Sequence, residues 1–291
     1  MTIDRWVNSL IVITLIEMMI AIGLGVAATD VVVAARRWQL TLRAAAANYL
    51  LVPAATIALL RLYHATPMVA AGFLILAACP GAPYGPPFTA IAKGNVATSV
   101  GLMVILASSS AIVAPLLLSV LLPLVSSDVE LRIEATRLIA TLFVTQLLPL
   151  CAGLGLRVWR PKLAAKMQPP ASLLSKIFNL VTIGLILATR YQTFLQIRLA
   201  AFAGMLLLLI ASLGVGWLLG GSTRDDRRAM ALTTALRNVG VSMVIAAGSF
   251  PGTPALTAVL AYALVELAGS LALALWWARR ARGLEAAGTL Y

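Results

Sequence analysis

The sequence has few charged residues and few residues that could bind a metal or form a disulfide. Only 11% of its 291 residues are charged, whereas a soluble domain has about 25%. The single histidine, His64, lies in a short loop without metal-ligand partners, so we expect no zinc site. The two cysteines, Cys79 and Cys151, lie far apart in apolar segments, which predicts two buried thiols and no disulfide.

Apolar residues make up 61% of the chain, and its mean hydropathy is +0.98. A fold in water could not bury this much apolar surface at this length, so much of it must face lipid. A soluble enzyme, a disordered protein and a nucleic-acid-binding protein are therefore excluded. The net charge of +12 fits loops rich in Lys and Arg at a membrane surface. The sequence predicts an all-α polytopic membrane protein in a lipid bilayer.

Runs of apolar residues bounded by charges or turn residues predict about nine transmembrane helices. The first run is long, contains Glu17 and is followed by Arg36 and Arg37, so we interpret it as a retained span and not a signal peptide. The predicted spans are 8–31, 40–62, 67–92, 95–124, 133–156, 173–190, 198–220, 228–250 and 254–278.

The loops differ in their content of Lys and Arg. One alternate set of loops holds 15 of these residues, the other holds 6, and Arg237 lies within a span. Cytoplasmic loops are the richer in Lys and Arg, so we expect the N-terminus outside and the C-terminus in the cytoplasm. An odd number of spans agrees with this, and the location predicted is a bacterial-type plasma membrane.

Two of the predicted spans are interrupted. The third contains four prolines and two glycines between Cys79 and Pro87, which a continuous helix cannot accommodate. The eighth contains a polar run in mid-membrane: Thr233, Thr234, Arg237, Asn238, Gly240 and Ser242. Broken backbone is tolerated in a membrane only where it is buried in protein or lines a cavity. Two broken spans of opposite direction predict an inverted-repeat transporter with its site at the midplane.

At these residues the sequence resembles the bile acid:sodium symporter family. Residues 79–81 (CPG) followed by residues 93–99 (KGNVATS) are similar to the family's first crossing-helix motif. Residues 237–240 (RNVG) are similar to its second, which is typically E-x-G-x-Q-N-x-G. Gly269, Ser270, Trp276 and Trp277 resemble its last helix. The similarity covers essentially the whole chain, most specifically residues 79–99 and 229–277.

The resemblance implies an organisation into two repeats and two packing units. The repeats would cover about 8–124 and 130–280, and the first element of the first repeat is missing, as in nine-helix members of the family. The panel would consist of 8–31, 133–156 and 173–190. The core would consist of 40–62, 67–92, 95–124, 198–220, 228–250 and 254–278.

The sodium-binding positions of the family are altered in this chain. Thr233 and Arg237 stand where the second crossing helix has a Glu and a Gln. Gly85 and Pro86 stand where the first break supplies Ser and Asn, and Met103 replaces a Thr. Sodium favours several oxygen ligands, and a nearby guanidinium repels it. The oxygen-bearing residues that remain for an ion are Asn48, Ser99, Thr233 and Thr234.

Three ionisable residues lie deep in spans: Glu17, Arg237 and Glu266. An isolated charge at the bilayer centre costs about 2.5–3.5 kcal/mol or more, so each needs a partner or water. We expect Arg237 and Glu266 to face one another across the core cavity, with Arg237 in place of a bound cation and Glu266 as a proton site. Asn238, Tyr84 and Thr89 complete the predicted substrate-binding set.

The predicted function is secondary transport of a small organic anion by alternating access. Coupling to sodium is expected to be weak or absent, which leaves proton coupling or uniport. Two alternatives remain: a metalloid or neutral-solute permease with Cys79 as a thiol ligand, and a non-transporting membrane sensor. No span has the paired aspartates, Ser/His pair or HExxH sequence of an intramembrane enzyme, so we expect neither enzymatic activity nor a cofactor. Substrate identity, transport direction and oligomeric state are open.

Overall fold

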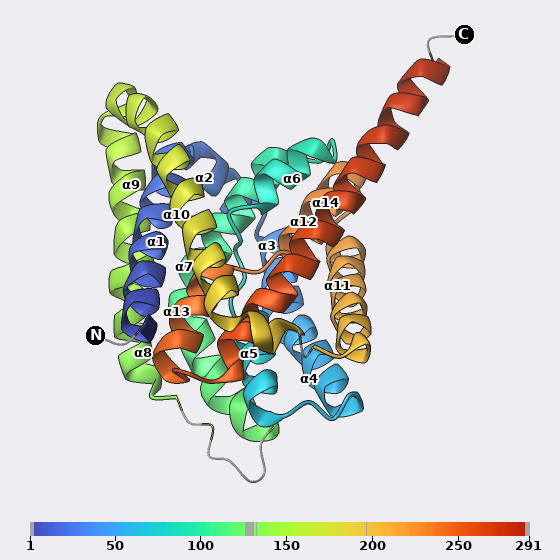
Figure 1. The fold of residues 1–291 in the computed structure, drawn as a ribbon. Coiled ribbons are helices and arrows are strands. Elements are labelled where there is room, and N and C mark those ends of the chain that lie inside the picture. The colour runs from blue at the N-terminus through green and yellow to red at the C-terminus, as the bar shows by residue number, and fades with distance from the viewer. Residues whose placement is uncertain (1–2, 126–130, 132, 196, 289–291) are drawn as a thin grey trace.

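The protein is described here by a computed structural model that covers residues 3–125, 131, 133–195 and 197–288, and these residues are almost entirely helical (Figure 1). Arg132 and the side chain of Arg282, which both entered the charge count, lie outside the described part. The elements of the first half are α1 (Ile3–Gly25), α2 (Ala28–Arg36), α3 (Trp38–Ala46), the π-helix η1 (Ala47–Leu51), α4 (Val52–Leu62), α5 (Pro67–Ala78), α6 (Gly85–Ile91), α7 (Val96–Leu121) and the 3₁₀-helix η2 (Leu122–Val125). Those of the second half are α8 (Ala135–Leu142), the π-helix η3 (Phe143–Leu147), α9 (Leu148–Trp159), α10 (Pro161–Leu195), α11 (Leu199–Leu219), α12 (Arg224–Ala235), α13 (Val239–Ser249) and α14 (Pro254–Gly288).

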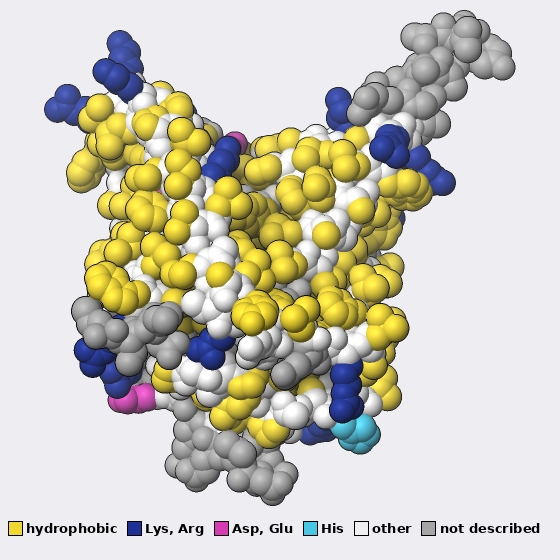
Figure 2. Space-filling model, viewed as in Figure 1, with side chains coloured by type: hydrophobic (Ala, Val, Ile, Leu, Met, Phe, Trp, Pro, Cys, Tyr) yellow, Lys and Arg dark blue, Asp and Glu magenta, His cyan; other side chains and the backbone are white. Residues whose placement is uncertain are grey.

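The multi-pass helical fold predicted from the sequence is confirmed. Within the described residues, eight helical stretches are long and apolar enough to cross a membrane. The predicted span 67–92 is not among them, because it consists of α5 and α6 separated by a non-helical segment. Hydrophobic side chains cover the middle of the molecule, whereas Lys and Arg gather toward its two ends (Figure 2). This distribution suits a protein surrounded by lipid.

The largest difference between predicted and observed helix bounds is in α10. The sequence predicts a helix over 173–190, whereas α10 runs from Pro161 to Leu195 and includes Pro169 and Pro170. A proline inside a helix removes one main-chain donor and frees a carbonyl. These two prolines lie close to the corner with α9, where water can satisfy the freed carbonyls.

Helix α1 packs most closely against α9 and α10. Gly23 and Gly153 make the α1–α9 contact possible, because a Cβ on either would collide with the main chain of the other helix. Small residues at such positions let two membrane helices approach closely. We call α1, α8, η3, α9 and α10 the panel and the remaining elements the core. Cys151 of α9 is exposed, so the prediction of a second buried thiol is wrong.

The first break is shorter than predicted. Helix α5 ends before Cys79, and α6 already begins at Gly85, so Pro86 and Pro87 lie in its first turn. Proline is tolerated in a first turn, where its missing N–H would have no partner in the helix. Gly81 has a φ of +86°, and a Cβ there would collide with the main chain of Ala107. The second break is the segment between α12 and α13, residues 236–238.

Candidate functional site

The two breaks lie against each other, as the sequence predicts. The Asn238 N–H donates to the carbonyl oxygen of Cys79 at 2.8 Å, and its side-chain amide lies 3.4 Å from the carbonyl oxygen of Gly81. The Asn238 side-chain oxygen also accepts from the N–H of Val241, so it caps the start of α13. One asparagine therefore holds both crossing segments together.

Arg237 is enclosed by oxygen atoms from three elements. Its guanidinium donates to the side-chain oxygen of Asn48 at 2.5 Å and to the Asn48 carbonyl at 3.3 Å. It also donates to the carbonyl oxygens of Leu76 at 3.2 Å and Thr234 at 3.0 Å, and to that of Ala77. All five N–H groups of a guanidinium are thus used. We call this arrangement the guanidinium cage.

The cage suits a positive charge for a physical reason. Leu76 and Ala77 lie in the last turn of α5, and Thr234 lies in the last turn of α12. Carbonyl groups at a helix C-terminus carry partial negative charge and lack partners within the helix. The third wall is the π-helix η1, in which Asn48 is fully buried. This geometry stabilises a cation that is bound by carbonyl and amide oxygens. Here the cation is the guanidinium of Arg237, which is part of the chain.

The predicted pairing of Arg237 with Glu266 across a cavity is wrong. Both side chains are only 1% exposed, and the Glu266 carboxylate accepts from the main-chain N–H of Arg237 at 3.1 Å. The guanidinium is directed into the cage instead, because two helix C-termini and Asn48 offer it five acceptors. The second carboxyl oxygen of Glu266 has no hydrogen-bond partner among the described residues.

Three hydroxyl groups form a second buried cluster beside the first break. The Ser99 hydroxyl lies 3.1 Å from those of both Thr89 and Thr233, and all three side chains are buried. Gly85 faces this cluster, since a Cβ there would lie 3.5 Å from the Ser99 oxygen. Thr89, which we predicted to contact substrate, instead forms a hydrogen bond with Ser99 in this cluster. Thr234, predicted as an ion ligand, has its hydroxyl 3.5 Å from the side-chain amide of Asn48.

A cavity of about 330 Å³ lies between the panel and the core. Figure 2 shows the surface hollowed between the arm that bears the α9–α10 corner and α14. Of the predicted substrate-binding residues, Tyr84 lines this cavity, whereas Arg237, Asn238, Thr89 and Glu266 do not. Cys79 is fully buried and does not line it either. Its polar lining includes Asp30, Tyr84, Gln168, Ser172, Ser175, Lys176 and Asn179.

Most of these polar residues were missed by the sequence analysis. Gln168, Ser172, Ser175 and Asn179 follow one another at intervals of four, three and four residues along α10. Such spacing places side chains on one face of a helix. The signal was present, but the predicted span began at residue 173, so the row was divided between a loop and a helix. Glu17 on α1 faces Ser175 of the same row.

A further polar cluster ties together the ends of three elements near the cavity. Asp226, at the start of α12, accepts two hydrogen bonds from Arg37 at 2.9 and 2.6 Å. Its carboxylate also accepts from Thr98 at 3.0 Å, Asn95 at 3.0 Å and Thr223 at 2.9 Å. Hydrogen bonding to the carboxylate raises the pKa of the Arg37 guanidinium. This cluster joins the α2–α3 corner to the starts of α7 and α12.

The comparisons with known proteins bear on this site. The model of the Sodium Bile acid symporter family matches residues 12–197, which include the first break and the polar face of α10. The chain belongs to this family. It is also 26% identical over 289 residues to an "Uncharacterized sodium-dependent transporter YocS" of Bacillus subtilis (strain 168), covering 97% of this chain and 87% of that relative.

Membership of the Sodium Bile acid symporter family gives the site its general role. The family consists of transporters and not of enzymes, so this chain is a multi-pass membrane transporter of the bile acid symporter type. Such a protein is embedded in the lipid bilayer and binds a small solute.

Proposed function

We propose that this transporter carries a small organic anion across a bacterial-type plasma membrane by alternating access between panel and core. The observation that carries the proposal is the 330 Å³ cavity beside the first break, which is lined by Lys176, Asn179 and Tyr84. A lysine and two neutral donors are suited to an anionic group such as a carboxylate or sulfonate. Apolar residues of α1 and α7, including Met18 and Met103, offer contact to an organic body.

The hollow between panel and core opens toward the end of the molecule that bears the α9–α10 corner (Figure 2). Loops rich in Lys and Arg are at this end, and the positive-inside rule assigns it to the cytoplasm. In this proposal the structure represents the inward-facing conformation, with the N-terminus outside.

For the coupling ion, we propose that the guanidinium cage replaces a bound sodium at the crossing of the breaks. The oxygen atoms there are occupied by a charge that belongs to the chain. A sodium ion within a few ångströms would be repelled even at an effective dielectric constant near 20. The buried hydroxyls of Ser99 and Thr233 bond to one another, and no carboxylate joins them among the described residues. Glu266, with one unpartnered oxygen, is then the group that carries a coupling proton.

Uptake of labelled cholate and taurocholate into proteoliposomes tests both parts of this proposal. With sodium replaced by choline at fixed pH, we expect the initial rate to stay unchanged, and an inward proton gradient should raise it. An initial rate of uptake that does not change with the proton gradient would indicate uniport. We expect Lys176→Gln to raise KM about ten-fold, the equivalent of one charge-assisted hydrogen bond.

Lys166→Gln is the matched control for Lys176→Gln, because it removes an exposed lysine of the same helix outside the cavity lining. A similar rise of KM in both variants would show that general surface charge is responsible. Loss of transport without sodium, together with full activity of Arg237→Gln, would show that the cage does not replace the ion.

A further inference from the structure

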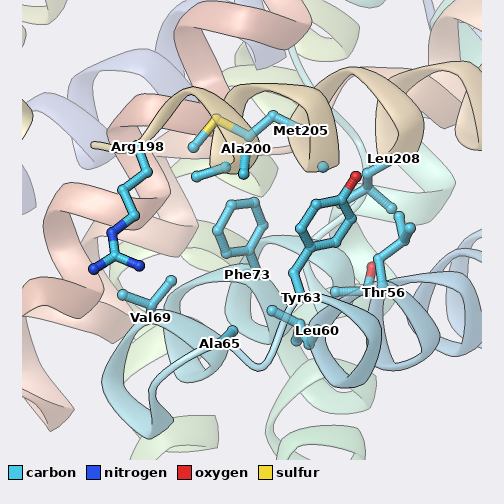
Figure 3. A pocket seen from close by; sticks show the side chains of 13 residues that line it. Thr56, Leu60, Tyr63, Ala65, Val69, Phe73, Arg198, Ala200, Met205 and Leu208 are labelled. Carbon is cyan, nitrogen blue, oxygen red and sulfur yellow. The ribbon is translucent and has the colours of Figure 1, made fainter.

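A second cavity, of about 220 Å³, lies between α4, α5 and α11, away from the panel (Figure 3). Its buried floor is formed by Thr56, Leu60, Met205 and Leu208. The rings of Tyr63 and Phe73 both line the slot, and the lining is almost entirely apolar (Figure 3). None of its lining residues belongs to the panel–core cavity. We call it the Arg198 groove, after the charged residue that lines it.

The groove exists because α11 presents small residues where it passes α4. Gly204 lies opposite Tyr63, and a Cβ on Gly204 would lie 3.4 Å from the tyrosine ring. Ala200 and Ala201, which are exposed, continue the open side toward the start of the helix. A dry apolar cavity of about 150 Å³ is enough to bind benzene, so this groove has room for a stretch of hydrocarbon chain.

The charge at the end of the groove selects the ligand. Arg198 is the N-cap residue of α11, and its exposed guanidinium extends toward Val69 at the groove's end (Figure 3). Among the residues that the structure describes, the Arg198 side chain has no hydrogen-bond or ion-pair partner, and only its main-chain carbonyl accepts, from the N–H of Ala201. Arg61 and His64 line the neighbouring cavity, which shares Leu60 and Ala65 with the groove. An apolar slot that ends in unpaired positive charge complements an acidic amphipath.

The surroundings of the groove indicate that this amphipath is a membrane lipid. The lipid-facing side chains of α11 beside it, Leu199 and Ile210, are 86% and 63% exposed. Arg198 and His64 lie in the connections at one end of the helices, the level at which lipid headgroups sit. We propose that the Arg198 groove binds one acyl chain of an anionic phospholipid, with the lipid phosphate on Arg198.

Native mass spectrometry of the full-length protein in detergent, titrated with phosphatidylglycerol or phosphatidylcholine, tests this site. We expect wild type to retain phosphatidylglycerol in preference to phosphatidylcholine. Arg198→Gln should weaken phosphatidylglycerol binding about ten-fold, the value of one charge-assisted contact. Gly204→Leu fills the groove and should remove binding of both lipids at this site.

The chain offers a matched control for each variant. Arg137→Gln removes an exposed arginine elsewhere, and Gly214→Leu adds the same side chain to α11 where no atom lies within 4 Å of the new Cβ. Should Gly204→Leu fail to fold, Ala201→Phe fills the groove from its exposed side. Equal retention of the two phospholipids by wild type, or equal losses in the groove variants and their controls, would overturn the proposal. Because no transport is measured, failure here leaves the proposed function untouched.

Discussion

Asn179 on the panel donates a 2.7 Å hydrogen bond to the hydroxyl of Tyr84, which belongs to the first break of the core. Both residues line the panel–core cavity, so a substrate that enters it meets this bond. In the proposed alternating-access mechanism, movement of the core past the panel breaks this bond. The bond would then connect substrate binding with that conformational change.

Tyr84→Phe should remove this bond and leave the ring in place. A neutral hydrogen bond contributes about 0.5–1.5 kcal/mol, so we expect a change of roughly 2- to 12-fold in the KM for the transported anion. Uptake kinetics in proteoliposomes measure it. Tyr191→Phe is the control, since Tyr191 lies in α10 outside the cavity lining and is 56% exposed. An unchanged KM in Tyr84→Phe would remove Tyr84 from the substrate site.

Arg237→Gln should make the protein responsive to sodium. The variant leaves buried carbonyl oxygens without donors, each at a cost of about 1–3 kcal/mol, and opens an oxygen-lined space where a cation can bind. We expect a lower Tm in choline buffer and partial recovery in sodium, whereas wild type should give the same Tm in both. Thermal unfolding followed by tryptophan fluorescence measures this. A wild-type Tm that rises with sodium as much as that of the variant would contradict the guanidinium cage as a substitute for the ion.

Asp226→Asn should destabilise the fold, because the carboxylate accepts bonds from four side chains and its own side chain is only 5% exposed. Hydrogen bonds to a charged group are worth about 1.5–3 kcal/mol in buried settings, and the 40% exposure of Arg37 reduces its share. We expect a clear fall in Tm. Asp225→Asn is the adjacent control: its side chain is 63% exposed and pairs with Arg228 at 3.7 Å, so its Tm should barely change. Equal Tm values for the two variants would show that the Asp226 carboxylate does not stabilise the fold.

Gly81→Ala should prevent the first break from forming. A φ of +86° costs a residue with a side chain about 1–3 kcal/mol, and the added Cβ also collides with the main chain of Ala107. We expect little folded protein on size-exclusion chromatography in detergent. Gly248→Ala, in α13 with no atom within 4 Å of the new Cβ, should behave as wild type. A monodisperse, active Gly81→Ala protein would contradict the local geometry.

Membrane orientation can be measured with single cysteines in a Cys151→Ser background, in which the remaining native cysteine, Cys79, is fully buried. We expect Ile3→Cys to react with an impermeant maleimide in intact cells. Trp159→Cys, at a position 83% exposed beside the α9–α10 corner, should react only after the membrane is opened. The reverse labelling pattern would invert the predicted topology.

The sequence was most informative where residue chemistry restricts the backbone. Prolines and glycines after Cys79 leave no continuous helix, and the run around Arg237 is too polar to face lipid, so both breaks could be predicted. The partners of the Arg237 side chain could not be predicted in this way. The carbonyl groups of Leu76 and Ala77 exist in any sequence, and only the crossing of the two breaks brings them to the guanidinium. Glu266 is the negatively charged residue that the sequence offers nearby, and the prediction that it pairs with the Arg237 guanidinium was wrong.

The covalent attachment of the caged cation has an electrical consequence. A sodium ion that travels with its substrate contributes about 2.3 kcal/mol per 100 mV of membrane potential, and it cancels one negative charge of the cargo. The guanidinium of Arg237 is released on neither side, so it adds nothing to that term. When a proton on Glu266 travels with the substrate, as proposed above, a monovalent anion crosses without net charge. Under uniport each turnover moves one net negative charge, and in a cell with a negative interior this current favours the outward direction.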